Sequence, residues 1–357
     1  MMDAMQYRES LKKMHTKVYY MGKQIENIVE DPMTSPHVNS AAMTYALAQD
    51  PVYEDLMTAK SHLTGKKINR FTHIHQSKED LVKKVKMLRM IAQNTGTCFQ
   101  RCVGFDAMNA TYITTFAVDH ARGTSYHARF QKWLQYVQEN DLMVAGAMRD
   151  VKGDRSRKPS GQQDADLFTH VVEKREDGIV ICGAKAHMTG IVNSHEMLIL
   201  PTSALSENDQ DYVARFAAFH RQNYGACKVG NADILIGASA LMADMNGAAG
   251  ASHIKDKLIE MVHLAETMYC CSLACSWEGQ ETPCGSYFVD PLLANEVKLN
   301  VTKNILLQTR NTARGQDPDR PAHRKHVRWN CPRRVHARRR LSTGNADYDL
   351  PGIESAA

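Results

Sequence analysis

The chain has 357 residues, 43% hydrophobic and 23% charged, which excludes a small disulfide-stapled scaffold and a globally disordered chain. No stretch approaches 18 consecutive apolar residues and residues 1–13 carry charge, so we expect neither a membrane-spanning helix nor a secretory signal, and predict a cytoplasmic protein. The net charge of +5 is uneven, because residues 303–357 hold 12 Lys and Arg against 5 Asp and Glu, which leaves 32 against 34 before them.

Helical patterns dominate the chain from Tyr7 to about Asp141. Ser77-Lys-Glu-Asp80 resembles a capping box, and apolar residues at helical spacing follow it until Gly96 offers a stop. A second long helix is predicted to begin near Cys98.

The periodicity changes to that of strands between residues 167 and 201. Residues 170–174 and 179–182 flank an Asp-Gly pair, which predicts a hairpin. Helical patterns return after residue 209, through Ala232–Met245 and then through His253–Trp277. There the predicted apolar stripe consists of Ile254, Leu258, Val262, Ala265 and Tyr269.

This order predicts an α+β fold with a helical domain at 1–141, a β domain at 142–208 and a second helical domain at 209–302. Residues 303–357 form an Arg-rich tail, and no packed helix or strand is expected between residues 315 and 340. We do not expect this tail to bind nucleic acid, because aromatic residues are not interleaved with its charges.

The cysteines form the first candidate site. Nine cysteines without an export signal argue against a disulfide framework. On one helix, Cys98 and Cys102 would share a face with about 5 to 6 Å between their Cβ atoms, so two thiolates could bind one metal centre. The alternative is a pair of small buried hydrophobic residues.

His220 and Cys227 lie seven residues apart, two helical turns, and a buried core histidine is the alternative there. Together with Cys98 and Cys102 they supply three thiolates and an imidazole, which suits an iron-sulfur cluster or a structural zinc. The spacing favours the cluster, because structural zinc ligands usually come in tight knuckles. A rival cysteine group on an apolar helix is expected to pack in the core: Cys270, Cys271 and Cys275.

A loop at the start of the β segment is the second candidate. Gly153 with Lys152 and Arg155 could present backbone N–H groups and positive charge to a pyrophosphate. The alternative is an ordinary solvated turn.

Six motifs together resemble the 4-hydroxybutyryl-CoA dehydratases, which belong with the 4-hydroxyphenylacetate 3-hydroxylase flavoproteins. The resemblance runs from about residue 7 to about residue 302. The motifs are Ala48-Gln-Asp-Pro51, Leu81-Val-Lys-Lys-Val-Lys-Met-Leu88, Cys98-Phe-Gln-Arg-Cys-Val-Gly104, Lys152-Gly-Asp-Arg155, Val172-Glu-Lys-Arg-Glu-Asp-Gly-Ile179 and His220-Arg-Gln222. It implies an acyl-CoA dehydrogenase-like fold, FAD, a [4Fe-4S] cluster, a homotetramer, and radical dehydration of 4-hydroxybutyryl-CoA to crotonyl-CoA with vinylacetyl-CoA isomerisation.

The resemblance also implies roles for individual residues. The cluster ligands would be Cys98, Cys102, His220 and Cys227. The catalytic residues would be His220, Tyr224 and Lys228. The residues bordering FAD would be Met148, Arg149, Asp150, Val151, Lys152, Gly153, Asp154, Arg155, His187, Met188, Thr189, Gly190 and Asn193.

The chain also departs from the family pattern. Relatives carry a longer β domain between the strand ending near Pro201 and His220, with a catalytic glutamate in it, and a longer helical half beyond Val301 with a second glutamate. Arg149 and Val151 replace a hydroxyl residue and a proline, and Met188 replaces a glutamine. The tail looks like translation in another reading frame. We therefore expect truncated middle and C-terminal parts, weak FAD binding and negligible dehydration by this chain alone.

Two other functions stay open. A non-catalytic remnant is consistent with the missing segments. An oxygen-dependent hydroxylase of the 4-hydroxyphenylacetate type has the same fold, but such hydroxylases need no cluster ligands.

Overall fold

Nine helices account for most of the ordered structure in the computed structural model, which describes residues 1–154, 156–157, 159–200 and 207–314. The helices are α1 (Ala4–Lys12), α2 (Ser35–Gln49), α3 (Glu54–Met57), α4 (Lys78–Thr95), α5 (Cys102–Arg122), α6 (Tyr126–Glu139), α7 (Glu207–Met245), α8 (Ser252–Trp277) and α9 (Pro291–Arg314). Short 3-10 turns lie at Pro51–Tyr53, Arg70–Thr72, Pro159–Gly161 and Ile191–Asn193.

The strands of the described residues form two-stranded sheets only. Four pairs are antiparallel: β1 (Val18–Tyr20) with β2 (Lys23–Ile25), β3 (Thr58–Lys60) with β4 (Lys67–Asn69), β6 (His170–Lys174) with β7 (Ile179–Cys182), and β9 (Gln280–Glu281) with β10 (Tyr287–Phe288). The fifth pairs β5 (Val144–Ala147) in parallel with β8 (Glu196–Ile199). The hairpin predicted around Asp-Gly is therefore confirmed as β6–β7.

The limits of α4 follow from local sequence signals. Ser77 is its N-cap, because the hydroxyl accepts a hydrogen bond from the Asp80 N–H at 3.2 Å, and Gly96 ends it with a φ of +63°. The predicted capping box is only half formed. The Asp80 carboxylate accepts from the Gln76 N–H, one residue before the N-cap, and bonds the side chains of Arg70 and His73.

The start of α5 differs from the prediction. It begins at Cys102, so Cys98 does not lie on this helix and the two thiols do not share a helical face. Gln100 adopts a φ of +70°, and α2 holds the segment in place. The Ser40 hydroxyl donates to the Cys98 carbonyl at 2.9 Å, and Gln100 Nε2 donates to the His37 carbonyl at 3.0 Å.

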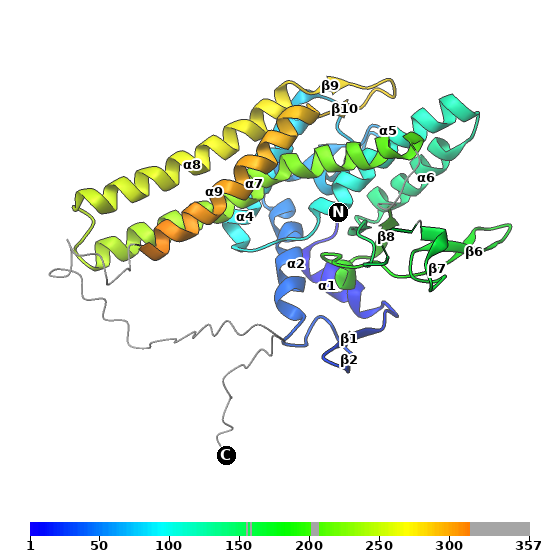
Figure 1. The fold of residues 1–357 in the computed structure, drawn as a ribbon, viewed down its shortest axis with the longest axis horizontal. Helices are drawn as coiled ribbons and strands as arrows, with labels where there is room; N and C mark the ends of the chain where they lie inside the picture. Colours follow the sequence, from blue (N-terminus) through cyan, green and yellow to red (C-terminus); the bar gives the residue numbers. More distant parts are fainter. Residues whose placement is uncertain (155, 158, 201–206, 315–357) are drawn as a thin grey trace, which may run out of the picture. The chain divides into compact units, whose positions relative to one another are not determined.

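α7, α8 and α9 lie alongside one another, and α7 also packs against α4 and α5 (Figure 1). Two glycines allow α7 to pack closely against α8 and α4. A Cβ on Gly225 would lie 2.3 Å from Ser272 Oγ of α8, and a Cβ on Gly230 would lie 2.3 Å from the Arg89 carbonyl of α4. The largest apolar core lies among these helices and α5, and it holds the His220–Cys227 segment against α4.

The buried face of α8 differs from the predicted stripe. Its buried residues are Met261, Ala265, Met268, Ser272, Cys275 and Ser276. Val262 is exposed instead, and of the rival cysteines only Cys275 is buried, while Cys270 is exposed. Two helical stretches, Tyr212–Met245 and Ser252–Trp277, are long and apolar enough to cross a membrane by length and composition alone, which differs from the expectation of no such helix.

The mixed order of helical, β and helical segments agrees with the predicted fold class. Residues 1–315 form one compact unit, and α9 runs through the domain limit predicted at residue 302. The limits at 141, 208 and 302 stay predictions. The tail predicted to lack packed structure, residues 315–340, lies outside the described residues.

Candidate active site

The three predicted cysteine ligands gather where residues 98–102 meet α7. Cys102 is buried, Cys227 is half-buried and Cys98 is exposed. Burial raises the pKa of the Cys102 thiol well above its usual range, and the neighbouring thiols of Cys98 and Cys227 raise it further. Burial also raises the pKa of Cys227 to about 11. The three thiols are therefore close enough to affect each other's ionisation, although Cys98 reaches the site from a loop.

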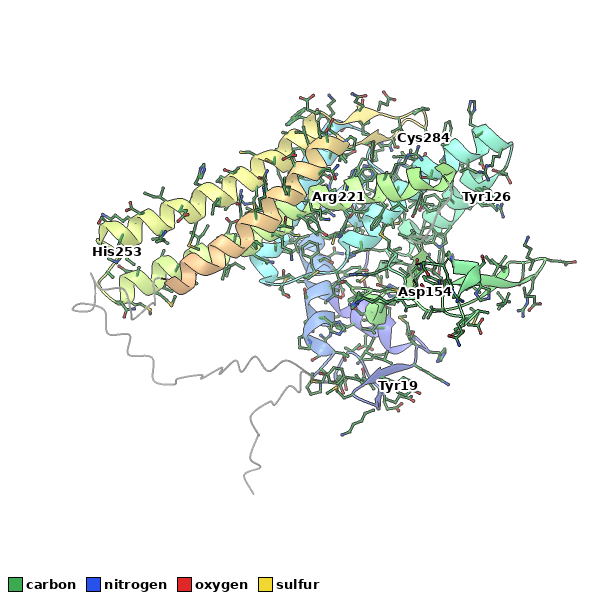
Figure 2. The ribbon with its side chains drawn as sticks, in the orientation of Figure 1. Tyr19, Tyr126, Asp154, Arg221, His253 and Cys284 are labelled. Carbon is green, nitrogen blue, oxygen red and sulfur yellow. The ribbon has the colours of Figure 1, made fainter. Side chains whose placement is uncertain are left out.

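His220 stands two helical turns before Cys227 on α7. Its ring stacks on Phe216, with 5.6 Å between centroids, and meets the Tyr224 ring edge-on at 5.3 Å. The side chain is 23% exposed, so it is accessible from outside the core. Arg221, the next residue, marks this part of α7 in Figure 2.

Tyr224 and Lys228 occupy the same stretch of α7. Burial raises the pKa of Tyr224, and negative charge on Cys102 and Cys227 raises it further, so its hydroxyl keeps its proton at neutral pH. The positive charge of Lys228 acts in the opposite direction on Cys227. The structure thus brings the predicted catalytic residues and three of the predicted ligands to one place.

A buried carboxylate at the centre of this site was not predicted from the sequence. Asp106 Oδ2 lies 2.8 Å from His220 Nδ1 and accepts a hydrogen bond from Asn223 Nδ2 at 2.6 Å. Its Oδ1 accepts from Lys84 Nζ at 2.6 Å, and both Lys84 and Asp106 are 0% exposed. The signal was present, because Asp106 lies four residues after Cys102 among apolar neighbours of α5.

The three cysteines and His220 were expected to bind either an iron-sulfur cluster or a structural zinc. Across the part of the chain that the structure describes, no three His, Cys, Asp or Glu side chains are close enough to hold one metal ion. A structural zinc requires four ligands about 2.0 to 2.3 Å from the same ion. In a [4Fe-4S] cluster each protein ligand binds a different iron, so its ligands are spread around the cluster. As placed, the described side chains form no site for a single metal ion such as zinc.

The loop predicted to border FAD is packed against side chains from residues 162, 167 and 185. Lys185 forms an ion pair with Asp150 and donates to the Met148 carbonyl at 3.2 Å. A Cβ on Gly153 would lie 2.6 Å from Gln162 Oε1 and 2.8 Å from Leu167 Cδ2, so this glycine permits internal packing. Asp154 lies on the same loop (Figure 2). Arg155, also predicted here, lies outside the described residues.

The second predicted FAD segment, residues 187–193, lies against the cysteine loop. A Cβ on Gly190 would lie 2.9 Å from Gln100 Cβ, so only glycine permits this approach. Asn193 is buried, and its Nδ2 donates to the Tyr7 hydroxyl at 3.0 Å. Segments at 98–102 and 187–193 are therefore neighbours, as a shared site requires.

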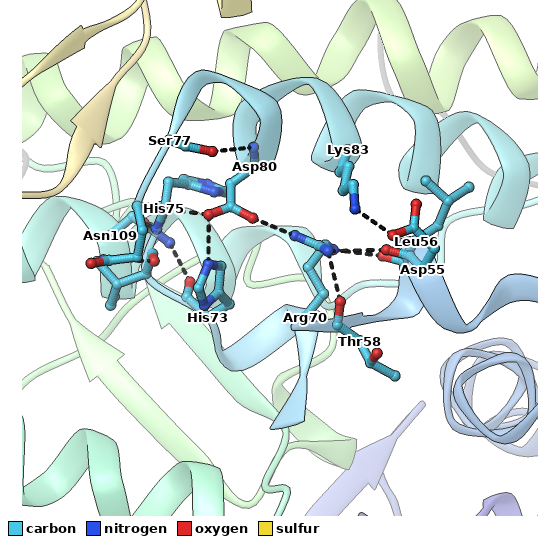
Figure 3. Close-up of polar contacts among 12 residues, drawn as sticks. Asp55, Leu56, Thr58, Arg70, His73, His75, Ser77, Asp80, Lys83 and Asn109 are labelled. Carbon is cyan, nitrogen blue, oxygen red and sulfur yellow. Dashed lines mark hydrogen bonds and ion pairs between the residues drawn. The ribbon is translucent and has the colours of Figure 1, made fainter. Parts of the chain in front are cut away.

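A cavity of about 870 Å³ lies elsewhere, beside α3, β3, β4 and the start of α4. At its edge Asp80 accepts from Arg70 Nη1 and bonds His73 Nε2, both at 2.8 Å (Figure 3). Other charges around it form the pairs Lys67–Glu54 and Lys83–Asp55. Most of the charged side chains that line this cavity are paired with one another and not free to bind a charged ligand. We therefore do not place the active site here.

Two family models match this chain. The model of the 4-hydroxyphenylacetate 3-hydroxylase N terminal matches residues 3–221, and that of the C terminal matches residues 210–308. This chain belongs to the 4-hydroxyphenylacetate 3-hydroxylase family.

Within the family, the chain is a close homologue of 4-hydroxybutyryl-CoA dehydratase. It is 49% identical to 4-hydroxybutyryl-CoA dehydratase/vinylacetyl-CoA-Delta-isomerase of Clostridium aminobutyricum over 374 residues, which is 85% of this chain and 76% of the relative. The solved structure of the oxygen-tolerant archaeal 4-hydroxybutyryl-CoA dehydratase from N. maritimus matches with a TM-score of 0.84 and 37% identity, over 90% of this chain and 80% of that one.

More distant members share the fold. The oxygenase component HpaB in complex with FAD and 4-hydroxyphenylacetate has a TM-score of 0.70 at 19% identity, over 86% of this chain and 79% of that one. The 4-hydroxyphenylacetate 3-monooxygenase oxygenase component of Thermus thermophilus is 26% identical over 59% of this chain and 43% of its own length.

The alignment with the Clostridium relative also measures a length difference. It runs over 374 positions, whereas 85% of 357 residues is about 303, so the relative has about 70 positions there that face gaps in this chain.

Proposed function

We propose that this chain carries the iron-sulfur part of a 4-hydroxybutyryl-CoA dehydratase site, with an acyl-CoA thioester as its substrate. The observation that carries the proposal is that Cys98 and Cys227 lie near Cys102, while the buried carboxylate of Asp106 lies near Cys102 and Cys227 and bonds His220. The 49% identity to a 4-hydroxybutyryl-CoA dehydratase supports the choice of substrate class.

The three thiolates and the imidazole of His220 would hold a [4Fe-4S] cluster. When bound, the cluster would supply an iron as Lewis acid for the departing hydroxyl group of the substrate. Tyr224 would offer a protonated hydroxyl as a hydrogen-bond donor to the substrate, and Lys228 contributes a positive charge beside Cys227. The aromatic rings of Phe216 and Tyr224 limit how the His220 ring can turn.

We propose that FAD binding and turnover by this chain alone are strongly reduced. Gln162 and Leu167 pack against Gly153, and Gln162 accepts from the Asp154 N–H, which leaves less of this loop for a phosphate. The roughly 70 positions that face gaps support a shortened region, which we place between β8 and α7. Removing one general base typically costs about 10² to 10⁴ in rate, and loss of the flavin site should cost more.

Metal analysis tests the cluster. We expect the protein purified without oxygen to contain iron and acid-labile sulfide, and the Cys98→Ala variant to contain less of both. Exposed Cys270 gives the matched control, because Cys270→Ala should leave the iron content unchanged. Zinc in place of iron, or equal iron in Cys98→Ala, would contradict the assignment.

Two further assays test the reduced activity. Flavin should separate from the chain during gel filtration, and crotonyl-CoA should not accumulate from 4-hydroxybutyryl-CoA under strict anaerobiosis. A yellow protein that retains stoichiometric flavin, or sustained turnover, would show that the shortened chain rebuilds the site.

We also propose a homo-oligomer that covers the apolar outer faces of α7, α8 and α9. Exposed apolar side chains on these helices are Ile234, Leu241, Met245, Ile259, Val262, Leu292 and Leu299. Light scattering should give a mass above the 40.1 kDa of one chain. A monomer at micromolar concentration would contradict this.

A further inference from the structure

We infer that Asp106 is the positioning residue of His220, fixing the orientation and the tautomer of its ring so that Nε2 is the nitrogen available to a metal. The inference rests on the proposed function, because it concerns a proposed cluster ligand. It adds Asp106, Lys84 and Asn223 to the site; Lys84 lies within the motif at residues 81–88, while Asp106 and Asn223 lie outside all six motifs.

The hydrogen bonds around Asp106 decide which ring nitrogen carries the proton. The carboxylate accepts from Lys84 at Oδ1 and from Asn223 at Oδ2, so it is used as an acceptor on both oxygens. A carboxylate paired with a lysine at 2.6 Å has no proton to donate. The proton shared with His220 at 2.8 Å therefore sits on Nδ1, and the lone pair of the neutral ring is on Nε2.

Metal-binding histidines commonly donate their second ring N–H to a carboxylate, and loss of this partner typically costs about 10- to 100-fold in metal affinity. Here the partner is itself held from several sides. Lys84 Nζ donates to the Phe219 carbonyl at 3.2 Å as well as to Asp106, and lies 5.3 Å from the Phe219 ring centroid. α4, α5 and α7 thus fix one carboxylate together, which gives it a single orientation.

Side-chain exposure increases from Lys84 and Asp106 to His220, which indicates that this hydrogen-bond network supports an accessible histidine. Lys84 and Asp106 are 0% exposed, while the His220 side chain at the end of the chain of bonds is 23% exposed. Asp106 also lies close enough to Cys102 and Cys227 to raise the pKa of both thiols. One carboxylate therefore bonds the histidine and lies near two of the three proposed cysteine ligands.

Two double variants isolate the acceptor at residue 106. Lys84→Met is common to both, so neither leaves a buried charge without a partner. Asp106→Asn with Lys84→Met keeps an oxygen that can accept from His220 Nδ1, whereas Asp106→Leu with Lys84→Met removes it. After anaerobic reconstitution, we expect the Asn variant to hold iron against a chelator like the wild type. The Leu variant should bind iron about 10- to 100-fold more weakly, resembling His220→Gln.

A second measurement uses the wild-type chain and needs no cluster. ¹⁵N NMR of the histidine-labelled apoprotein at about pH 8, above the usual histidine pKa, reports which ring nitrogen is protonated. The His220 signal is assigned by its loss in His220→Gln. We expect a proton on Nδ1 and none on Nε2.

The outcomes separate this inference from the proposed function. A wild type that binds no iron overturns the cluster, while the NMR result still decides the tautomer. Equal iron binding by the two double variants, or an Nε2–H tautomer in the wild type, overturns the role of Asp106. Both double variants should show cooperative unfolding; if they do not, the wild-type tautomer alone decides.

Discussion

Two carboxylates in this protein, the half-buried Asp80 and the fully buried Asp106, have the same kinds of partner and different surroundings. Asp80 binds Arg70 and His73, and Asp106 binds Lys84 and His220. The partners of Asp80 lie 10 and 7 residues away in the chain, while those of Asp106 lie 22 and 114 residues away. The first network joins one helix start to the loop before it, and the second joins three helices.

The histidines show what this difference means. The His73 side chain is 3% exposed and its Nε2 is hydrogen-bonded to Asp80, so the ring is buried in a local structural contact. His220 is partly exposed, beside Tyr224 and the cysteines. A carboxylate with a cation and an imidazole can thus stabilise a fold or orient a ligand, and the accessibility of the imidazole distinguishes the two roles.

The largest expected effect comes from breaking the Asp106 pair on one side. Lys84→Met leaves a fully buried carboxylate without its cation, which should destabilise the protein by about 3–5 kcal/mol. Urea unfolding measures this. The double variant with Lys84→Met and Asp106→Leu should recover most of the lost stability. Lys84→Met as stable as the wild type would contradict this prediction.

A smaller loss is expected at Asp80. Asp80→Asn removes the negative charge and one of the two oxygens that bond Arg70 and His73, and a hydrogen bond to a charged group is worth about 1.5–3 kcal/mol. Arg70 keeps the backbone carbonyls of Asp55, Leu56 and Thr58 as acceptors, and the Asp80 side chain is 17% exposed. Iron content should not change, because this network is separate from the proposed site. Loss of iron in Asp80→Asn would remove the distinction between the two carboxylates.

We expect the stability that Asp80 contributes to depend on pH in the acid range. Burial alone would raise its pKa, but the hydrogen bond and charge of His73 and the Gln76 N–H outweigh burial and hold the pKa well below its usual range. Since the folded pKa is below the unfolded value of about 3.9, this stability is complete above that value and is lost as the pH falls below it. The stability difference between wild type and Asp80→Asn should therefore shrink below about pH 4. A constant difference down to pH 2 would contradict this.

The smallest effect concerns the cap beside Asp80. Ser77→Ala removes the acceptor for the Asp80 N–H and should cost about 1 kcal/mol. Thermal unfolding should show a small decrease in Tm with no change in cofactor content. A loss as large as that of Asp80→Asn would mean that Ser77 does more than cap α4.

Local signals explain what the sequence predicted well. Gly96 and the Asp-Gly turn act on their immediate neighbours, so the end of α4 and the β6–β7 hairpin could be placed. The start of α5 could not, because hydrogen bonds from α2, about 60 residues earlier, hold residues 98–101 outside the helix. The resemblance supplied His220 and the cysteines, but Asp106 became visible only when α4, α5 and α7 were brought together.

The central claim is that His220 and three cysteines bind one iron-sulfur cluster. Pulsed electron paramagnetic resonance of the reduced, reconstituted protein with ¹⁵N-labelled histidine measures it directly. The account predicts a cluster signal coupled to one histidine nitrogen, retained in Asp80→Asn and absent in His220→Gln. A cluster signal without nitrogen coupling, or the same coupling in His220→Gln, would contradict it.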